Sequence, residues 1–141
     1  MEANFLESLE TIPTVVLDPY LVINMTATLT VGALLSCKLA RFVICDHFSV
    51  TDFLSDGYVR LKEGIDQEKL ETVSVSAVDM SDLLPMRNVL ALSQVAIIAA
   101  ARCHQGLFAS DCCVFRRMAQ TVPSSDNVIC GRTLRERFCL N

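Results

Sequence analysis

The feature that most constrains this chain is one long segment with a helical pattern, residues 86–105. Pro85 precedes it, and proline is tolerated in the first turn of a helix. Ser81-Asp82 supplies a capping signal further upstream, and Gly106 follows, a residue type that often stands directly after a helix. No helix breaker lies between, so the sequence predicts a helix near 86–105.

The apolar residues of this segment cover almost its whole circumference instead of one stripe. Such a helix is buried on several sides. A domain formed by 141 residues has little other surface with which to cover it, so we expect a second copy of the chain to help. The candidate core and oligomer-contact residues are Val89, Leu90, Ile97 and Ile98.

Composition supports one compact domain over residues 1–141. Apolar residues make up 52% of the chain and charged residues 20%, which is enough apolar surface to offset the entropy lost on folding. With 5 Gly and 4 Pro and no biased segment, linker-like and collagen-like chains are excluded.

The N-terminal half reads as strands. Residues 14–17 and 20–23 are β-branched runs separated by Asp18-Pro19, a turn dipeptide, and residues 26–31 alternate between polar and apolar. The ambiguous segment 33–45 is interpreted as a strand. Alternation in 58–62 and 70–78 predicts a β-hairpin.

Helices follow at the C-terminal end. Beyond the segment 86–105, a helix is predicted from Asp111 to Gln120, and Thr133 with Glu136 matches the capping box of a final helix. Strands first and helices later predict an α+β fold, with N-terminal antiparallel strands and a hairpin followed by C-terminal helices.

A membrane segment is disfavoured. Residues 19–37 carry no charge, but polar side chains recur through them and part of the run alternates with period two, as in a strand. The chain begins with acidic residues where a secretory signal has basic ones. We expect a cytoplasmic, reducing location.

Seven cysteines are present, an odd number, and no CxxC pair occurs. In a reducing compartment these thiols stay free. Cys45-Asp46-His47 and Cys103-His104 each place a cysteine near a histidine, as a thiol site requires, but adjacency in sequence does not bring the side chains together. Cys103-His104 followed by Cys112-Cys113 points to zinc, but its spacing does not match the paired ligands of structural zinc. The residues therefore indicate no catalytic residue, no metal ligand and no cofactor.

Charge is divided unevenly along the chain. Residues 1–101 carry a net charge of −7 and residues 102–141 a net charge of +3, and all six C-terminal cations are arginine. If the two C-terminal helices pack side by side, their arginines form a patch suited to phosphate or carboxylate groups. The candidate binding residues are Arg116, Arg117, Arg132, Arg135 and Arg137.

These features favour a small, non-enzymatic, intracellular interaction or regulatory protein that self-associates, a class that includes virus-encoded accessory factors. Its expected partners are another protein and a second copy of itself. The alternative from another class is an RNA- or DNA-binding protein that uses the arginine patch. A third possibility is a thiol- or zinc-dependent enzyme.

Overall fold

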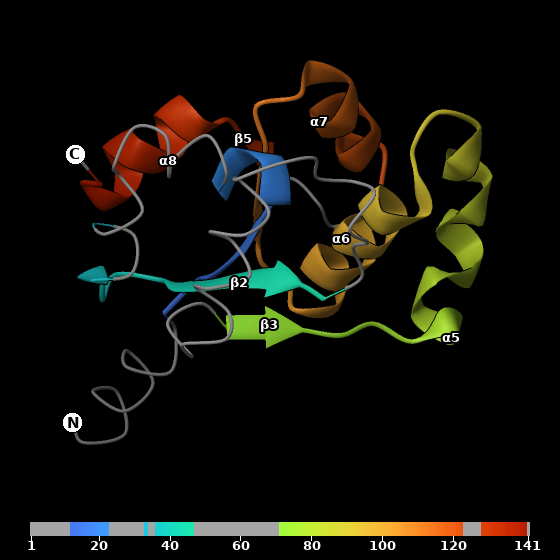
Figure 1. Ribbon diagram of the computed structural model, residues 1–141, viewed down its shortest axis with the longest axis horizontal. Coiled ribbons are helices and arrows are strands. Elements are labelled where there is room, and N and C mark those ends of the chain that lie inside the picture. Colours follow the sequence, from blue (N-terminus) through green and yellow to red (C-terminus); the bar gives the residue numbers. More distant parts are fainter. Residues whose placement is uncertain (1–11, 23–32, 34–35, 47–70, 123–127, 141) are drawn as a thin grey trace, which may run out of the picture.

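A computed structural model describes residues 12–22, 33, 36–46, 71–122 and 128–140, and all structural statements below refer to these residues (Figure 1). The elements in chain order are strands β1 (Thr14–Leu17), β2 (Arg41–Cys45) and β3 (Glu71–Val73), helix α5 (Ala77–Met80), the 3-10 helix η2 (Ser81–Asn88), helix α6 (Leu92–Cys103), strand β4 (Leu107–Ala109), helix α7 (Cys113–Gln120), strand β5 (Val128–Ile129) and helix α8 (Gly131–Phe138).

The five strands form one parallel sheet in the order β3-β2-β1-β4-β5. At its centre Val16 of β1 is level with Val43 of β2 on one side and with Phe108 of β4 on the other. Parallel neighbours cannot be joined by a tight turn, so each connection must cross over a face of the sheet. The architecture is therefore α/β, with a Rossmann-like arrangement.

Helices cover both faces of this sheet. Helices α5, α6 and α7 and the 3-10 helix η2 pack on one face, where Phe115 of α7 contacts Phe108 of β4 with ring centroids 4.7 Å apart. Helix α8 packs on the other face, where Phe138 meets Phe42 of β2 edge to face at 5.6 Å. In Figure 1 α8 lies to one side of the central strands, and α6 and α7 lie to the other.

The predicted α+β fold with antiparallel strands is wrong. Where central strands are covered on both faces, successive residues are apolar, and Val15, Val16 and Leu17 of β1 are all fully buried. Such a run shows no alternation, and it does not reveal whether its neighbours run parallel or antiparallel. The mistaken fold class follows from that ambiguity.

The interpretation of residues 20–23 as a strand is also wrong, because residues 19–22 are helical. Asp18-Pro19 is a turn signal, but the same pair is a favourable helix start, with aspartate as the N-cap and proline as the first helical residue. The amide N–H of Leu21 donates to the carbonyl of Asp18 at 2.9 Å, as expected for the first turn. Asp18-Pro19 therefore marks a junction between a strand and a helix, not the turn of a hairpin.

Only parts of the other predicted strands are confirmed. The strand within 33–45 covers Arg41–Cys45, while Ala33 and Ser36 are helical. Within 70–78 only Glu71–Val73 is a strand, and it pairs with β2 in parallel, not as one arm of an antiparallel hairpin. The segments 26–31 and 58–62 lie outside the described residues.

The predicted helix 86–105 is confirmed only from Leu92 to Cys103. Its first part belongs to the 3-10 helix η2, which contains Pro85, and a break separates the two. The N-cap of α6 is Ala91, whose amide donates to the side-chain oxygen of Gln94 at 2.9 Å. The side chain of Gln94, at the third position of the helix, thus caps the N-terminus of α6, in place of the Ser81-Asp82 cap that the sequence predicts.

Gly106 has a different role from the one its position predicts. The left-handed conformation after α6 belongs to Gln105, with φ of 49°. A Cβ atom on residue 106 would lie only 2.5 Å from the carbonyl oxygen of Thr14. Glycine is required here because α6 turns directly into β4 against the start of β1.

The two C-terminal helices begin elsewhere than predicted. Helix α7 begins at Cys113, two residues after Asp111. Helix α8 begins at Gly131, so Thr133 lies inside it and the predicted capping box is not its start. No helix among the described residues is long and apolar enough to cross a membrane.

Candidate functional site at the carboxyl edge of the sheet

A polar residue follows each described strand at the same edge of the sheet. Because all strands are parallel, their carboxyl ends meet there. Open α/β sheets bind ligands at this edge, so the polar residues that follow the strands mark a candidate site. Its members are Asp18 after β1, Asp46 after β2, Ser74 after β3, Ser110 after β4 and Cys130 after β5.

The strand order changes direction between β1 and β4. From β1 the sheet continues through β2 and β3 on one side and through β4 and β5 on the other. At such a switch point the connections leave towards opposite faces of the sheet, and a crevice remains outside the strand ends. Asp18 and Ser110 stand on the two sides of this point.

Asp18 is buried, with 4% of its surface exposed. One carboxylate oxygen, Oδ1, accepts the backbone N–H of Tyr20 at 3.1 Å, as an N-cap does. The other, Oδ2, accepts the hydroxyl of Ser110 at 2.7 Å. Both oxygens therefore act as acceptors, which is the role of an ionised carboxylate.

Asp111, the next acid along this edge, is exposed and contacts the start of α8. Its Oδ1 accepts the backbone N–H of Gly131 at 2.7 Å, so its charge faces the positive end of that helix. A Cβ on residue 131 would lie 2.7 Å from a methyl group of Leu21 and 2.9 Å from Oδ1 of Asp111. Glycine at position 131 thus makes room for this carboxylate.

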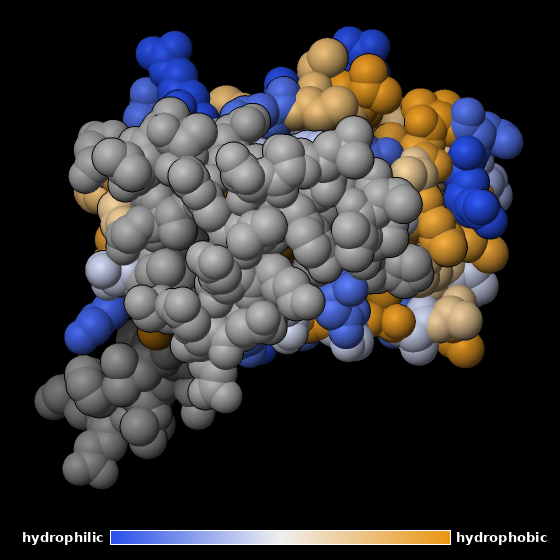
Figure 2. Space-filling model, in the orientation of Figure 1, coloured by the Kyte–Doolittle hydropathy of each residue, from blue (hydrophilic) through white to orange (hydrophobic). Residues whose placement is uncertain are grey.

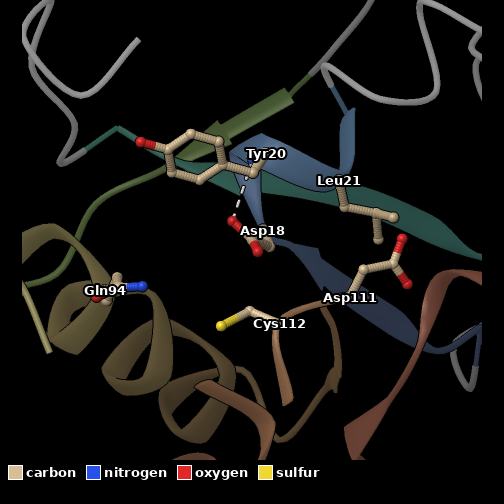
Figure 3. Close-up of a pocket in the computed structure, with 6 residues that line it drawn as sticks. All are labelled: Asp18, Tyr20, Leu21, Gln94, Asp111 and Cys112. Carbon is tan, nitrogen blue, oxygen red and sulfur yellow. Dashed lines mark hydrogen bonds between the residues drawn. The ribbon is translucent and has the colours of Figure 1, made fainter. Parts of the chain in front are cut away.

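A cavity of about 430 Å³ opens at the switch point, lined by Asp18, Tyr20, Leu21, Gln94, Asp111 and Cys112. Figure 3 shows the carboxyl group of Asp18 near its middle, with the Gln94 amide nitrogen pointing towards it from α6. The Asp111 carboxylate lies beside Leu21 on the opposite side. The residues come from the ends of β1 and β4, from the turn 19–22 and from the first turn of α6.

Two acidic side chains, Asp18 and Asp111, line the cavity. Burial raises the pKa of Asp18 above its ordinary value; the hydrogen bonds from Ser110 and from the Tyr20 amide lower it, and the nearby charge of Asp111 raises it again. A buried carboxylate beside a second carboxylate is stabilised by any positive group that enters. Titratable groups perturbed in this way gather at functional sites.

The predicted arginine patch divides between two faces of the molecule. Arg116 and Arg117 lie on α7, over one face of the sheet, whereas Arg132, Arg135 and Arg137 lie on α8, over the other. The side-by-side packing that would join them is therefore not formed. Arg116 donates to the carbonyl of Ser110 at 2.8 Å, and Arg132 pairs with Glu136 at 3.2 Å.

The four candidate oligomer residues also differ in their surroundings. Leu90, Ile97 and Ile98 are buried within the chain, with exposed fractions of 5%, 2% and 2%, whereas Val89 is 59% exposed. Residues 95–101 are all buried by the sheet and its neighbouring helices. One copy of the chain thus covers this part of α6 by itself.

The thiol and imidazole groups singled out in the sequence do not gather. Cys103 and His104 lie at the C-terminal end of α6, while Cys112 precedes α7 and lines the cavity. Among the described residues, no three histidine, cysteine, aspartate or glutamate side chains form a cluster that could hold a metal ion. None of the seven cysteines, all of which lie within the described residues, forms a disulfide.

Sequence reasoning missed the residues that the structure brings together, Asp18, Ser110 and Asp111. A signal for them exists, because apolar runs end in an acid in Leu17-Asp18 and in Cys45-Asp46. Phe108-Ala109 followed by Ser110-Asp111 repeats it. In a parallel sheet this repetition marks one edge, but with an antiparallel interpretation the same acids are scattered over both edges.

Comparisons with known proteins bear on the fold only. No protein-family model matches the chain, and no curated protein sequence matches it either. A solved structure similar to this one is the crystal structure of PAE2754 from Pyrobaculum aerophilum, with 10% sequence identity and a TM-score of 0.63. The similarity covers 92% of this chain and 91% of that chain, and at this identity it shows a shared fold.

Proposed function

We propose that this domain binds a small, positively charged ligand in the cavity at the switch point of the sheet. The observation that carries the proposal is the position of Asp18, a carboxylate that is 4% exposed, lines the cavity and stands at the carboxyl end of β1. Isolated buried charges are costly, and a protein keeps them where they are paired or used.

The immediate partners of Asp18 support this proposal. Its two hydrogen bonds come from a hydroxyl and a backbone amide, and neither carries a positive charge. The charge that acts on its pKa is that of another carboxylate, Asp111, which raises it. A cation in the cavity supplies the charge complement that these described contacts do not.

The role we propose is binding without chemistry, in line with the non-enzymatic regulatory class that the sequence favours. Helix α6 supports ligand binding from the second side of the cavity. The oxygen of the Gln94 side chain is used by the Ala91 amide, which leaves the NH₂ group of Gln94 to donate to the oxygen of a water molecule that accompanies the cation.

Calorimetric titration with magnesium chloride, manganese chloride and ethylammonium chloride tests this proposal. We expect saturable binding of at least one of these cations to the wild-type chain and its loss in Asp18→Asn, which keeps the shape but not the charge. Glu136→Gln is the matched control, because it removes a carboxylate from the exposed face of α8. Wild-type protein that binds none of the three cations contradicts the proposal.

Self-association is a second candidate function. It is favoured by exposed apolar side chains on the α5–η2 segment, where Val78 is 80%, Leu84 41% and Val89 59% exposed. Figure 2 shows apolar surface on the side of the molecule where α5, η2 and α7 lie. Scattered single residues are ordinary, but contiguous apolar surface often marks a contact between proteins.

Light scattering at micromolar concentration measures this association. We expect the mass of a dimer for the wild-type chain and of a monomer for the double variant Val78→Asp, Val89→Asp. Leu39→Asp, which changes an equally exposed apolar residue before β2, is the control and keeps the dimer. A monomer in the wild type rules this function out.

A further inference from the structure

We propose that Ser110 is a positioning residue, which fixes the orientation of the Asp18 carboxylate towards the ligand without touching the ligand itself. This inference rests on the proposed function. Ser110 is 0% exposed and is not one of the residues that line the cavity. Any effect of its hydroxyl on a bound ligand must therefore pass through the groups that it contacts, the Asp18 carboxylate and the Cys112 amide.

The direction of the hydrogen bond between these two residues is fixed by its neighbours. The Ser110 hydroxyl oxygen accepts the backbone N–H of Cys112 at 3.1 Å. A serine hydroxyl has one proton to give, and it lies 2.7 Å from Oδ2 of Asp18. The chain of contacts runs from the Cys112 amide to the Ser110 oxygen, and from the Ser110 proton to the carboxylate.

Two donors then hold the two oxygens of Asp18 at once. The Tyr20 amide binds Oδ1 at 3.1 Å from the chain that follows β1, and Ser110 binds Oδ2 from the end of β4. With both oxygens held, the plane of the carboxylate is set, and each oxygen keeps a second lone pair for a ligand. Figure 3 shows this group between Tyr20 and Cys112, inside the ring of lining residues.

The backbone of Ser110 is held in place by two further hydrogen bonds. Its carbonyl accepts Nη1 of Arg116 at 2.8 Å, and its amide donates to the carbonyl of Ile129 at 3.0 Å in β5. The backbone of Ser110 is therefore tied both to α7 and to the neighbouring strand. This gives the hydroxyl a fixed base from which to orient the carboxylate, as a preorganised binding site requires.

The same pair of residue types recurs at the other end of the edge and provides a matched control. The Ser74 hydroxyl after β3 donates to Oδ2 of Asp46 after β2. Both of these residues are exposed, and neither lines the cavity. A general requirement for serine–aspartate pairs at this edge would make the two serines equally important, whereas positioning for the ligand concerns Ser110 alone.

The experiment measures the affinity for manganese and for ethylammonium, as their chlorides, in Ser110→Ala, Ser110→Thr and Ser74→Ala. We expect Ser110→Ala to weaken binding by about tenfold, from the usual size of one hydrogen bond to a charged group. Ser110→Thr keeps the hydroxyl and restores affinity to within about threefold, which a merely space-filling role does not explain. Equal affinity in the wild type and in Ser110→Ala overturns the proposal.

A measurement without any ligand separates this inference from the proposed function. Three-bond couplings between the α and β protons of Asp18 report whether its side chain holds one rotamer. We expect one rotamer in the wild type and in Ser110→Thr, and averaged couplings in Ser110→Ala. If none of magnesium, manganese and ethylammonium binds the wild type, the proposed function fails. If the Asp18 rotamer is the same in all three proteins, the positioning role fails, whatever the binding result.

Ser110→Cys covers the case in which Ser110→Ala does not fold. The thiol has nearly the size of the hydroxymethyl group but is a weak donor. We expect a folded protein with averaged Asp18 couplings and weakened binding. A folded Ser110→Cys variant with the wild-type rotamer and affinity contradicts the proposal.

Discussion

Two aspartate–serine pairs stand on the same edge of the sheet, and they have different surroundings. Asp18 and Ser110 are 4% and 0% exposed, whereas Asp46 and Ser74 are both exposed. Each pair joins neighbouring parallel strands through one hydrogen bond from hydroxyl to carboxylate. The two pairs therefore have the same residue types and lie at the same edge of the sheet, and they differ in which strands they follow.

The difference comes from topology. Strand β1 is the central strand and β4 is its neighbour across the switch point, where the chain connections diverge to opposite faces and a cavity forms. Strands β2 and β3 lie at one side of the sheet, where β3 is the last strand of the described order. A carboxylate becomes a candidate binding group here through its position in the sheet and not through its sequence neighbours.

The largest effect we expect is that of Asp18→Ala on stability. The substitution removes the cap of the turn 19–22 and leaves the buried Ser110 hydroxyl without its acceptor. The loss of a cap and of a buried acceptor together cost about 3 kcal/mol in the free energy of unfolding. Urea denaturation measures it, and a loss as small as that of Asp46→Ala would show that the two pairs are equivalent.

The dependence of stability on pH sharpens the same comparison. Because burial raises the pKa of Asp18 in the folded state, the folded protein binds this proton more tightly than the unfolded chain. The contribution of Asp18 to the free energy of unfolding is therefore greatest below the unfolded pKa and is lost as pH rises through the folded pKa.

The variant Asp18→Asn has no such titration, so subtracting its stability isolates this contribution. We expect the difference in unfolding free energy, wild type minus Asp18→Asn, to decrease as pH rises from about 4, the unfolded value of aspartate, towards neutrality. Acids that do not interact with Asp18 cancel in the subtraction, among them Glu71 and Asp82, whose pKa values are lowered by Arg41 and Arg102. A difference that grows with pH would contradict the assignment of Asp18 as a buried carboxyl group with a raised pKa.

How much of this could be read from the sequence depends on the length of the elements. Strand β1 and helix α6 were predicted over most of their extent, because Thr14–Leu17 is a strong β-branched run and residues 92–103 contain no breaker. Strands β4 and β5 have three and two residues, too short for any periodicity. Because the sequence does not reveal these two strands, the C-terminal helices follow one another directly in the predicted order, and the alternation of strand and helix that marks an α/β fold is hidden.

The candidate site was hidden for a related reason. Asp18 and Ser110 are 92 positions apart, and only the parallel pairing of β1 with β4 brings them together. Sequence patterns describe neighbours along the chain, whereas the register between two buried strands is set by packing on both faces. The arginines, by contrast, were visible as a cluster in the sequence, and the sheet separates them.

A smaller effect is expected from Gly131→Ala, which tests the second carboxylate of the cavity. The added Cβ meets a methyl group of Leu21 at 2.7 Å and Oδ1 of Asp111 at 2.9 Å. Both are side-chain atoms that can shift, so we expect a loss of about 1 kcal/mol in the free energy of unfolding, from crowding at a packed position.

The displaced Asp111 carboxylate then loses its hydrogen bond from the Gly131 amide, and cation binding weakens if this charge takes part. Unfolding in urea and titration with manganese chloride measure the two effects separately. Arg117→Ala, an exposed change on α7, is the control for both measurements. Unaltered cation affinity in a folded Gly131→Ala variant would leave Asp18 as the sole charge of the site.

The smallest effect is expected from Ser74→Ala, at the exposed pair. The Asp46 carboxylate is exposed, so water can replace the lost hydroxyl as a donor, and an exposed substitution of this kind changes the unfolding free energy by less than about 0.5 kcal/mol. Ser110→Ala removes a hydroxyl donor from a carboxylate that is 4% exposed, so its loss should be several times larger. Urea denaturation of the two variants side by side measures the ratio. If Ser74→Ala is as costly as Ser110→Ala, burial at the switch point is not what distinguishes the two pairs, and the choice of Asp18 over Asp46 as the binding carboxylate loses its basis.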